Sequence, residues 1–444
     1  MKNNIEALEK TRHPLLGKEN AVVEASRCIN CYDAPCIHAC PTSINIPQFI
    51  SRIANDDLEG SAQSILESNI LGYSCATVCP VEVLCEGSCV YNNLEDPPIR
   101  IGDLQKYAMA HFYEKDAQQR LDSLSNTSVT GTGGIKKQDI KVAAIGSGPA
   151  SLAFAAYIVL NGGEADIFEK EQEAGGLNTY GVAPYKISYA ESLKEVGLIK
   201  DLGVNIKTGV EVGKDISGAD LLSNYDAVFI GNGLGKDNFV IDLESLDNVQ
   251  GALPLISSLK QGDLASIQGV VRALVIGGGN TALDIAQELA LGGVEKVTMA
   301  YRRSEEDMSG YAHELKLARS LGVEFLPNHS PLNSLKSEDK QNKLSAVVFA
   351  TPSGEVSIGA DLVVFATGQL KHPLQDIFAD IKLNDNGTVA VAKDMSSNLD
   401  KVYAGGDSVN NGKEVVNAVA EGRQAAYSAL KKSNKEVYWG RFSE

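Results

Sequence analysis

Long hydrophobic runs are absent from this sequence, and so is any excess of positive charge. No stretch approaches the roughly 18 consecutive apolar residues of a membrane-spanning helix, and the first residues have no apolar core like that of a secretory signal. We therefore expect a cytoplasmic protein. The 444 residues include 40 Lys and Arg against 57 Asp and Glu, a formal net charge of −17. Nucleic acids and anionic membranes bind through clustered Lys and Arg, so neither is expected as a partner.

Cysteine is absent from most of the chain, since none follows Cys89. The eight cysteines form two runs, each with one Cys-Pro pair. The first run holds Cys28, Cys31, Cys36 and Cys40, and the second holds Cys75, Cys79, Cys85 and Cys89. A disulfide framework fits a reducing cytosol poorly, and a Cys-x-x-Cys spacing alone would also suit structural zinc. The complete spacing is typical of iron–sulfur proteins, so we predict two clusters in one helical domain.

A dinucleotide-binding motif follows the cysteine runs. Residues 141–145 form a short apolar stretch that predicts a strand, and Gly146 and Gly148 separate it from a predicted helix. The first glycine makes the tight turn, and the second lets a pyrophosphate approach the helix N-terminus. Glu169 ends the next predicted strand, where a carboxylate accepts hydrogen bonds from ribose hydroxyls. Ser151 stands in place of the usual third glycine.

A second motif of the same kind predicts that one chain binds two dinucleotides. The strand 273–276 leads into a glycine turn and the helix 283–291. The following strand, 297–301, is succeeded by Arg302 and Arg303, where a ribose-binding acid would otherwise stand. Arginine at this position can accommodate a 2′-phosphate, which favours NADP over NAD. An exposed basic pair without a ligand is the alternative.

Two later segments complete the pattern of a flavoenzyme. The apolar stretch 360–366 predicts a buried strand, and it leads to Gly368, where the chain would cross back from a nicotinamide domain. A strand from residue 402 leads to Gly406 and Asp407, and a helix follows at 415–430. In such folds the aspartate binds the ribityl–phosphate region of FAD, and the positive end of the helix stabilises a reduced flavin. A surface loop is the alternative for residues 405–407.

Together these motifs resemble the glutamate synthase small-subunit superfamily over nearly the whole chain. Within it they are most similar to the N-terminal half of dihydropyrimidine dehydrogenase, which some bacteria make as a separate subunit. The long gap after Cys79, the additional Cys75 and Gln105 carry this similarity. The resemblance implies that one [4Fe–4S] cluster is held by Cys28, Cys31, Cys36 and Cys89. It implies that the other is held by Cys40, Cys79, Cys85 and Gln105, with Cys75 unligated.

The resemblance also implies which residues bind the dinucleotides. For FAD they are Gly146, Gly148, Pro149, Ala150, Glu169, Gly176, Leu177, Gly406 and Asp407. For the nicotinamide cofactor they are Gly277, Gly279, Asn280, Thr281, Arg302 and Arg303, and Lys186 and Gly368 complete the cofactor-binding set. Two positions depart from the family. Lys186 replaces an arginine and keeps its charge but not its planar fork, and Ser309 replaces a second phosphate-binding arginine, which leaves NAD as the alternative to NADP.

The predicted architecture is α/β. We expect an α-helical iron–sulfur domain at residues 1–125, a linker rich in Ser, Thr and Gly at 126–139, an FAD domain at 140–268 and 369–444, and an NAD(P) domain at 269–368 inserted into it. Both nucleotide domains are expected to be Rossmann-like. No acid–base triad is predicted and the catalytic residues stay unassigned, because hydride transfer between nicotinamide and flavin requires none.

The resemblance implies an electron-input subunit of dihydropyrimidine dehydrogenase. Electrons from NAD(P)H would pass to FAD and then singly through the two clusters to an FMN-containing catalytic subunit with ferredoxin-type clusters, in a hetero-oligomer. That partner reduces uracil or thymine to the 5,6-dihydro form, reversibly. The small subunit of glutamate synthase, or another NAD(P)H-dependent electron-transfer flavoprotein, is one alternative. A non-catalytic iron–sulfur redox sensor is another.

Overall fold

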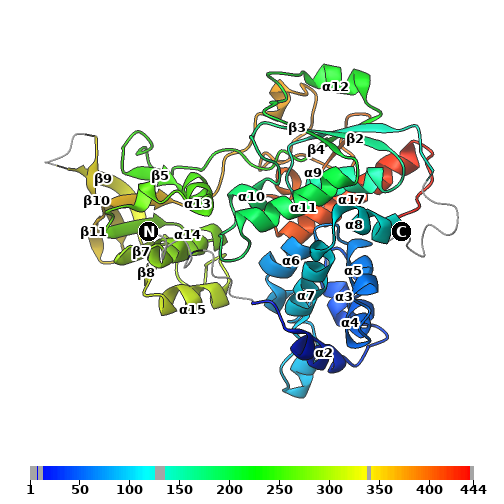
Figure 1. Ribbon diagram of the computed structural model, residues 1–444. Helices are drawn as coiled ribbons and strands as arrows, with labels where there is room; N and C mark the ends of the chain where they lie inside the picture. Colours follow the sequence, from blue (N-terminus) through cyan, green and yellow to red (C-terminus); the bar gives the residue numbers. More distant parts are fainter. Residues whose placement is uncertain (1–7, 9–13, 126–135, 338–341, 441–444) are drawn as a thin grey trace. The chain divides into compact units, whose positions relative to one another are not determined.

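The computed structural model of the protein describes residue 8 and residues 14–125, 136–337 and 342–440. The chain divides into two compact units (Figure 1). The larger unit comprises His13–Asn178, Ala190–Leu234 and Lys371–Glu444, and the smaller comprises Met1–Arg12, Thr179–Tyr189 and Gly235–Leu370. Each unit contains a five-stranded parallel sheet with helices, which confirms the predicted α/β class.

The sheet of the larger unit has the strand order β13–β4–β1–β2–β3, and every pairing is parallel. Its strands are β1 (Lys141–Ile145), β2 (Glu164–Glu169), β3 (Asn205–Thr208), β4 (Ala227–Ile230) and β13 (Val402–Ala404). Along β1, Val142 and Ala144 join the hydrophobic core on one face, whereas Ala143 and Ile145 join a separate core on the other. Because both faces are buried, this strand is apolar without alternation.

Two helices of the larger unit, α9 (Pro149–Val159) and α17 (Val415–Lys432), touch backbone to backbone. A Cβ built on Gly422 would lie 2.0 Å from the carbonyl oxygen of Ala150, so only glycine permits this approach. Further helices are α10 (Leu177–Tyr180), α11 (Tyr189–Asp201), α12 (Gly218–Asn224) and α16 (Asp407–Asn410).

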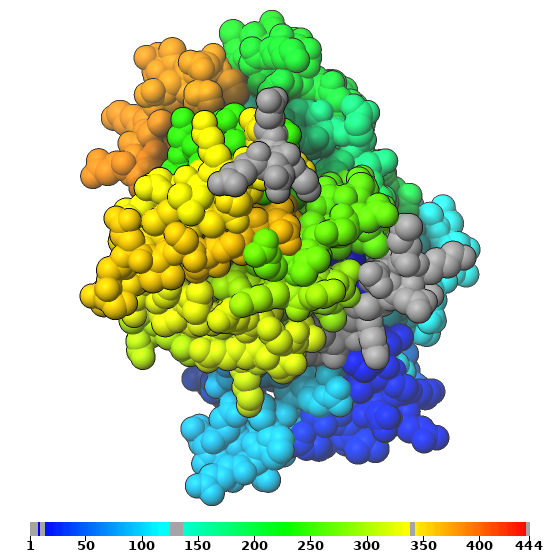
Figure 2. Space-filling view, turned by 90° about the vertical axis from the view of Figure 1, so that its left-hand side faces the viewer, coloured from blue at the N-terminus to red at the C-terminus, as the bar shows by residue number. Residues whose placement is uncertain are grey.

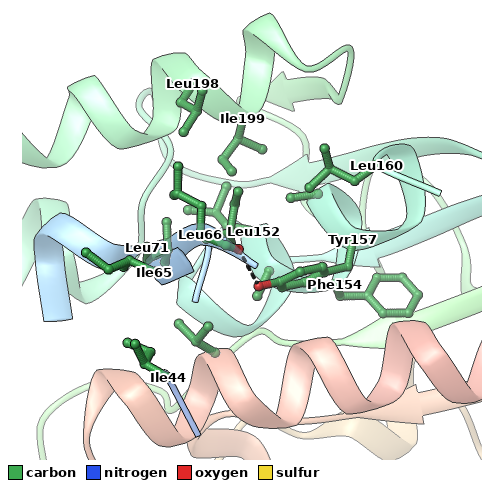
Figure 3. Packing of buried hydrophobic residues seen from close by; sticks show 14 of the residues in the cluster. Ile44, Ile65, Leu66, Leu71, Leu152, Phe154, Tyr157, Leu160, Leu198 and Ile199 are labelled. Carbon is green, nitrogen blue, oxygen red and sulfur yellow. Dashed lines mark hydrogen bonds between the residues drawn. The ribbon is translucent and has the colours of Figure 1, made fainter. Parts of the chain in front are cut away.

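The cysteine-bearing part of the larger unit is helical, as predicted. Its helices are α2 (Lys18–Ser26), α3 (Pro35–Ala39), α4 (Ile46–Ala54), α5 (Leu58–Leu66), α6 (Gly72–Val78), α7 (Ile101–Glu114) and α8 (Ala117–Ser125). One hydrophobic core joins these helices to α9, α11 and α17. Figure 3 shows Leu66 and Leu71 gathered with Leu152 and Ile199. The hydroxyl of Tyr157 donates to the carbonyl of Leu66 at 3.1 Å, so the two parts also share a buried hydrogen bond.

The predicted linker, 126–139, lies largely outside the described residues. Its last part is anchored, because the side-chain amide of Gln138 donates to the carbonyls of Asn161 (2.6 Å) and Glu436 (2.8 Å). Trp439 is completely buried close by, and its backbone N–H donates to Asn161 Oδ1 at 2.8 Å. Hydrogen bonds between residues far apart in the sequence therefore hold this part of the larger unit together.

The sheet of the smaller unit has the order β5–β12–β6–β7–β8, again parallel throughout. Its strands are β5 (Val249–Gly251), β6 (Arg272–Ile276), β7 (Lys296–Ala300), β8 (Glu324–Leu326) and β12 (Leu362–Phe365), and its helices are α13 (Ala252–Lys260), α14 (Asn280–Leu291) and α15 (Ala312–Ser320). A three-stranded antiparallel sheet accompanies them, formed by β9 (Ser330–Lys336), β10 (Leu344–Thr351) and β11 (Gly354–Gly359). Figure 2 views this unit from the side of that sheet (yellow).

Within the described ranges, no helix is both long and apolar enough to cross a membrane.

The contact between α9 and α17 predicts how two glycine substitutions differ. Gly422→Ala should lower the free energy of unfolding by about 1–3 kcal/mol, because the added methyl group meets the Ala150 carbonyl. Gly197→Ala is the matched control: this helical glycine in α11 has no neighbour within 4 Å of the added Cβ, so it should raise stability by up to about 1 kcal/mol. Urea unfolding followed through the fluorescence of Trp439, the chain's one tryptophan, measures both. Equal effects would contradict the packing described.

Candidate cofactor and cluster sites

The four cysteines assigned to the first cluster line one cavity. These are Cys28, Cys31, Cys36 and Cys89. The apolar side chains of Ile46, Ile50, Ile99 and Ile101 also line it. Cys36 lies in the first turn of α3, which begins at Pro35, and Cys89 comes from a segment more than fifty residues further along the chain. The fold thus brings together the crossed set that the resemblance implies.

These thiols are crowded. Burial and the neighbouring thiols of Cys28 and Cys89 raise the pKa of Cys36 to about 12. Burial, with the thiols of Cys31 and Cys89, raises the pKa of Cys28 as well. Bound iron would supply positive charge here and favour the thiolate forms. In the part of the chain that the structure describes, no group of three or more His, Cys, Asp or Glu residues is arranged to hold a metal ion. The thiols surround a cavity instead, which suits a multi-iron cluster.

The second set lies around the end of α6. A hydrogen bond with Cys75, burial and the thiols of Cys75, Cys40 and Cys85 together raise the pKa of Cys79. Gln105 of α7 is buried, and its Nε2 donates to the carbonyl of Gly72 at 2.7 Å. This bond engages the amide nitrogen, which leaves the oxygen as the atom able to ligate iron. Cys40, Cys79 and Cys85 are therefore neighbours, and Cys75 accompanies them.

The FAD-binding residues predicted at the first glycine turn converge around Ser147. Glu169 Oε2 accepts hydrogen bonds from the Ser147 N–H (2.8 Å) and hydroxyl (2.6 Å). Gly146 has a φ of +81°, which permits the tight turn, and Gly176 approaches so closely that a Cβ on it would lie 2.6 Å from Gly148 Cα. Three hydrogen bonds to Glu169, one of them from the N–H of Glu171, leave the carboxylate with further acceptor capacity. The loop at Gly146–Gly148 and the loop at Gly176 lie so close together that no side chain fits between them; we call them the FAD cradle.

The predicted FAD-binding segment at Gly406 also lies at the start of α9, beside the first glycine turn. Gly406 has a φ of +71°, and a Cβ on it would lie 3.0 Å from that of Ala150, at the start of α9. Its N–H donates to Glu421 Oε2 at 2.6 Å. Burial and the charge of Glu421 raise the pKa of Asp407, the first residue of α16, to about 6. The three segments assigned to FAD therefore meet at the N-terminus of α9, the kind of position at which a helix can stabilise a pyrophosphate.

The second glycine turn is also tightly enclosed. A Cβ on Gly277 would lie 2.3 Å from the Ala366 carbonyl oxygen, and one on Gly278 would lie 2.4 Å from the Tyr301 ring. Gly279 caps the N-terminus of α14, so the turn presents backbone N–H groups as an anion site does. Asn280 Oδ1 accepts from the N–H of Tyr311 at 3.0 Å, which fixes the loop beside the turn.

Arg302 and Arg303 follow β7 and are exposed. The Arg303 guanidinium lies 5.5 Å from the centre of the Tyr301 ring, the ring that contacts the glycine turn. The Ser309 hydroxyl is also near, 3.5 Å from where a Cβ on Gly279 would lie. Thr281 is exposed in the first turn of α14. Arg303 and Ser309 therefore lie beside the second glycine turn, where the sequence predicts that the nicotinamide cofactor binds.

Comparison with known proteins agrees with this geometry. Residues 5–117 match the family model described as dihydropyrimidine dehydrogenase domain II, 4Fe-4S cluster. Residues 140–422 match the model described as pyridine nucleotide-disulphide oxidoreductase. The chain belongs to the pyridine nucleotide-disulphide oxidoreductase family. Its similarity extends over both parts, so this member combines the family's nucleotide-binding fold with an N-terminal iron–sulfur domain.

Curated relatives of this oxidoreductase cover nearly its whole length. The glutamate synthase [NADPH] small chain of Escherichia coli (strain K12) is 32% identical over 91% of this chain and 90% of its own. The NAD-dependent dihydropyrimidine dehydrogenase subunit PreT of Salmonella typhimurium is 32% identical over 96% of each chain. The suspected superfamily is confirmed, and with it the flavin, iron–sulfur and nicotinamide cofactors of an NAD(P)-dependent oxidoreductase.

Solved structures show the same fold. Thioredoxin reductase of T. acidophilum matches with a TM-score of 0.55 and 19% identity, covering 67% of this chain and 99% of that one. Mycobacterium tuberculosis FprA in complex with NADPH matches with a TM-score of 0.55 and 18% identity, covering 69% and 88%.

Two predicted cofactor residues of the oxidoreductase have contacts within the smaller unit. The Lys186 ammonium lies 2.7 Å from Asp284 Oδ1 and 2.9 Å from Glu314 Oε1. Burial alone would lower the pKa of Lys186, but these two carboxylates raise it above its usual value. Gly368 has a φ of +92°, and its carbonyl accepts from the Asn238 N–H at 2.9 Å. The structure thus places the Lys186 charge in an ion-pair network with α14 and α15.

Sequence reasoning missed Glu195, which holds the N-terminus of α6. Its Oε1 accepts from the Tyr73 N–H at 2.9 Å, and its Oε2 accepts from the Ser74 N–H at 3.1 Å and from the Ser74 hydroxyl. Burial raises the pKa of Glu195 to about 7, even though these hydrogen bonds act in the opposite direction. An acid in a mixed helix far from its partners gives no sequence signal, so only the fold identifies it.

Stability should depend on pH through Glu195. Its pKa is about 7 in the folded chain and near 4.5 when unfolded, so the native state binds the proton more tightly between these values. The free energy of unfolding should therefore fall as pH rises through this window, by about 3 kcal/mol in all. Glu195→Gln should remove this part of the pH dependence of the free energy of unfolding. Urea unfolding of the wild type and of Glu195→Gln at pH 4.5, 6 and 8, followed through Trp439 fluorescence, tests this prediction. If the free energy of unfolding changed equally with pH in both proteins, the prediction would be wrong.

Proposed function

We propose that this chain is the electron-input subunit of a dihydropyrimidine dehydrogenase. In this role it takes electrons from NAD(P)H onto FAD and passes them singly through two [4Fe–4S] clusters to an FMN-containing partner. The observation that carries the proposal is the hydrophobic core shared by the cysteine-bearing helices and by α9, whose N-terminus forms the FAD cradle. A common core holds cluster and flavin sites at a fixed separation, as electron transfer between them requires.

The chain's own residues would divide the work as follows. Backbone at Gly277 and Gly279 binds the dinucleotide phosphates, and Arg302 and Arg303 bind a 2′-phosphate. Gly146 and Gly148 bind the FAD pyrophosphate at the start of α9. Bound FAD would supply the chemistry that links two-electron hydride transfer from the nicotinamide to single-electron transfer. The N-terminus of α17 provides partial positive charge where a reduced flavin would become anionic.

The first and second clusters would be held by the two sets of ligands assigned above. Each set consists of soft thiolates, with Gln105 as the one oxygen donor in the second set, and such ligands suit iron–sulfur clusters. The apolar side chains around the first cavity would exclude water from it. Exclusion of water and hydrogen bonds to the sulfurs then tune the reduction potentials.

A second candidate function is the small subunit of a glutamate synthase. Its support is the equal identity to the Escherichia coli small chain. The electron path inside the chain would be the same, and only the acceptor would differ. Gln105 and the spacing around Cys79 favour the first candidate.

The partner decides between these candidates. The purified chain should support NAD(P)H-dependent conversion of uracil to dihydrouracil when mixed with the FMN-containing partner of a PreT-type enzyme. Mixed with a glutamate synthase large subunit, it should give no glutamate from 2-oxoglutarate and glutamine. The reverse pattern would overturn the proposal in favour of the second candidate.

The relay predicts that the flavin and cluster steps separate. Cys36→Ala should lose the first cluster, about four iron atoms per chain, while hydride transfer from NAD(P)H still bleaches the flavin in rapid mixing. Partner-dependent pyrimidine reduction should then collapse. Cys75→Ala is the control, because an unligated cysteine can be removed with iron content retained. Pyrimidine turnover at the wild-type rate in Cys36→Ala protein lacking that iron would exclude the cluster from the relay.

Cofactor choice depends on the two arginines after β7. Arg302→Ala with Arg303→Ala should raise KM for NADPH about tenfold or more and leave KM for NADH nearly unchanged, since hydrogen bonds to a charged group contribute about 1.5–3 kcal/mol. Lys296→Ala with Lys316→Ala changes the net charge equally, and both lysines belong to the same unit, so this pair controls for general electrostatics. Equal responses to the two cofactors would show that the arginines do not recognise a phosphate.

A further inference from the structure

Two buried ionisable side chains connect the elements assigned to FAD to the second set of predicted cluster ligands. The first is Arg423 of α17, which is 7% exposed. Its Nη1 donates to the carbonyl of Thr42 at 3.0 Å and to that of Ser68 at 2.6 Å. Thr42 follows Cys40 by two residues, and its hydroxyl lies 3.3 Å from the Cys40 sulfur. Arg423 therefore holds the segment that carries one predicted ligand.

The second is Glu195 of α11, which is 2% exposed and binds the first N–H groups of α6. That short helix ends at Val78, directly before Cys79, and its first carbonyl, from Gly72, accepts the hydrogen bond of Gln105. The Ser74 hydroxyl donates to Glu195 and accepts from Asn178 Nδ2 at 2.9 Å. One hydrogen-bonded chain thus runs from residue 178 to the helix that precedes a predicted ligand.

Both connections begin at segments assigned to FAD. Arg423 follows Gly422, the residue whose backbone touches Ala150 at the start of α9. Asn178 follows Gly176 and Leu177, and Gly176 touches Gly148. A further hydrogen bond between the two parts is shown in Figure 3, where the Tyr157 hydroxyl of α9 donates to the carbonyl of Leu66. The second ligand set is therefore joined from two sides to the FAD cradle.

The segments of the first set are joined chiefly to one another. Arg27, which precedes Cys28, donates from Nη2 to the carbonyl of Pro97 at 2.6 Å. The hydroxyl of Tyr91, which follows Cys89 by two residues, donates to the carbonyl of Arg27 at 2.7 Å. These hydrogen bonds fix the first set within the helical part, whereas those of the second set extend to the nucleotide fold.

We propose that Arg423 and the Ser74–Glu195 pair are positioning residues that hold the second cluster at a fixed separation from FAD and so set the rate of electron transfer between the two. The inference rests on the proposed function. In the step concerned, one electron leaves the donor and enters the acceptor, and no covalent bond forms or breaks. Buried charges are costly unless they are hydrogen-bonded, and directional bonds hold groups more narrowly than apolar contacts do. A displacement of about 1 Å can cost a hundredfold in a positioned reaction.

The test uses Ser74→Ala in the full chain with its cofactors. This change removes the link between Asn178 and Glu195 and leaves the two backbone bonds to Glu195. Ser61→Ala is the matched control, because Ser61 is equally buried in the helical part and its hydroxyl donates to the Phe49 carbonyl at 2.9 Å. Pulse radiolysis delivers one electron to a cluster. The electron then passes to oxidised FAD within the same chain, and this transfer appears as a change in flavin absorbance whose rate does not depend on protein concentration. Ser74→Ala should slow this phase several-fold, and Ser61→Ala should not.

Hydrogen exchange provides the second measurement. The amides of residues 72–78 should exchange faster in Ser74→Ala than in Ser61→Ala, in the protein with and without cofactors, because α6 is held less firmly. Arg423→Lys, which keeps the charge but not the fork, should also slow transfer. Iron content, FAD content and flavin bleaching by NAD(P)H should match the wild type in every variant.

Two outcomes would overturn the inference. One is a wild-type transfer rate in Ser74→Ala; the other is a slower rate that merely follows lost iron or lost FAD, because the residues would then retain cofactors without setting their separation. A wild-type protein that shows no transfer between cluster and flavin would instead contradict the proposed function itself.

Discussion

The backbone contact between α9 and α17 is the constraint on which the larger unit depends. Gly422 lets the Ala150 carbonyl approach, so the helix that begins at the FAD cradle and the helix that carries Arg423 are in direct backbone contact. Any side chain at position 422 would separate them. The FAD cradle, the buried hydrogen bonds of Arg423 and the core shown in Figure 3 all follow from this approach.

A single core has a consequence for function that separate domains would not have. The helices that carry the cysteines share one buried hydrophobic core with α9 and α11. Electron transfer depends on the separation of donor and acceptor, so a shared core makes the protein matrix part of the mechanism. Buried polar residues such as Tyr157 and Glu195 then select one arrangement among those that apolar packing alone would allow.

The sequence predicted the nucleotide-binding elements well because glycine turns and apolar strands are local signals. Strand β1 has the predicted bounds, and α17 ends two residues after the predicted position, at Lys432. Helix α14 begins at Asn280, three residues before the predicted start, because Gly279 acts as its N-cap. The crossed set of four cysteines came from a family resemblance, and spacing alone did not select it.

The remaining features depend on contacts between distant residues. Glu195 and Arg423 are ordinary polar residues of helices by sequence, and only the folded chain places them against Ser74 and Thr42. The antiparallel sheet β9–β11 was not predicted, because strands β9 and β11 are largely exposed and carry mixed polar residues. Lys186 illustrates the same limit: its charge could be read from the sequence, but its two carboxylate partners could not.

The metal and flavin content of the protein tests the central claim most directly. After anaerobic purification or reconstitution, the account predicts about eight iron atoms and one FAD per chain, the content of two four-iron clusters and one flavin site. Inductively coupled plasma mass spectrometry with flavin absorbance gives both numbers from one sample. Zinc in place of iron, or iron without flavin, would contradict an electron-transfer flavoprotein built around these cysteines.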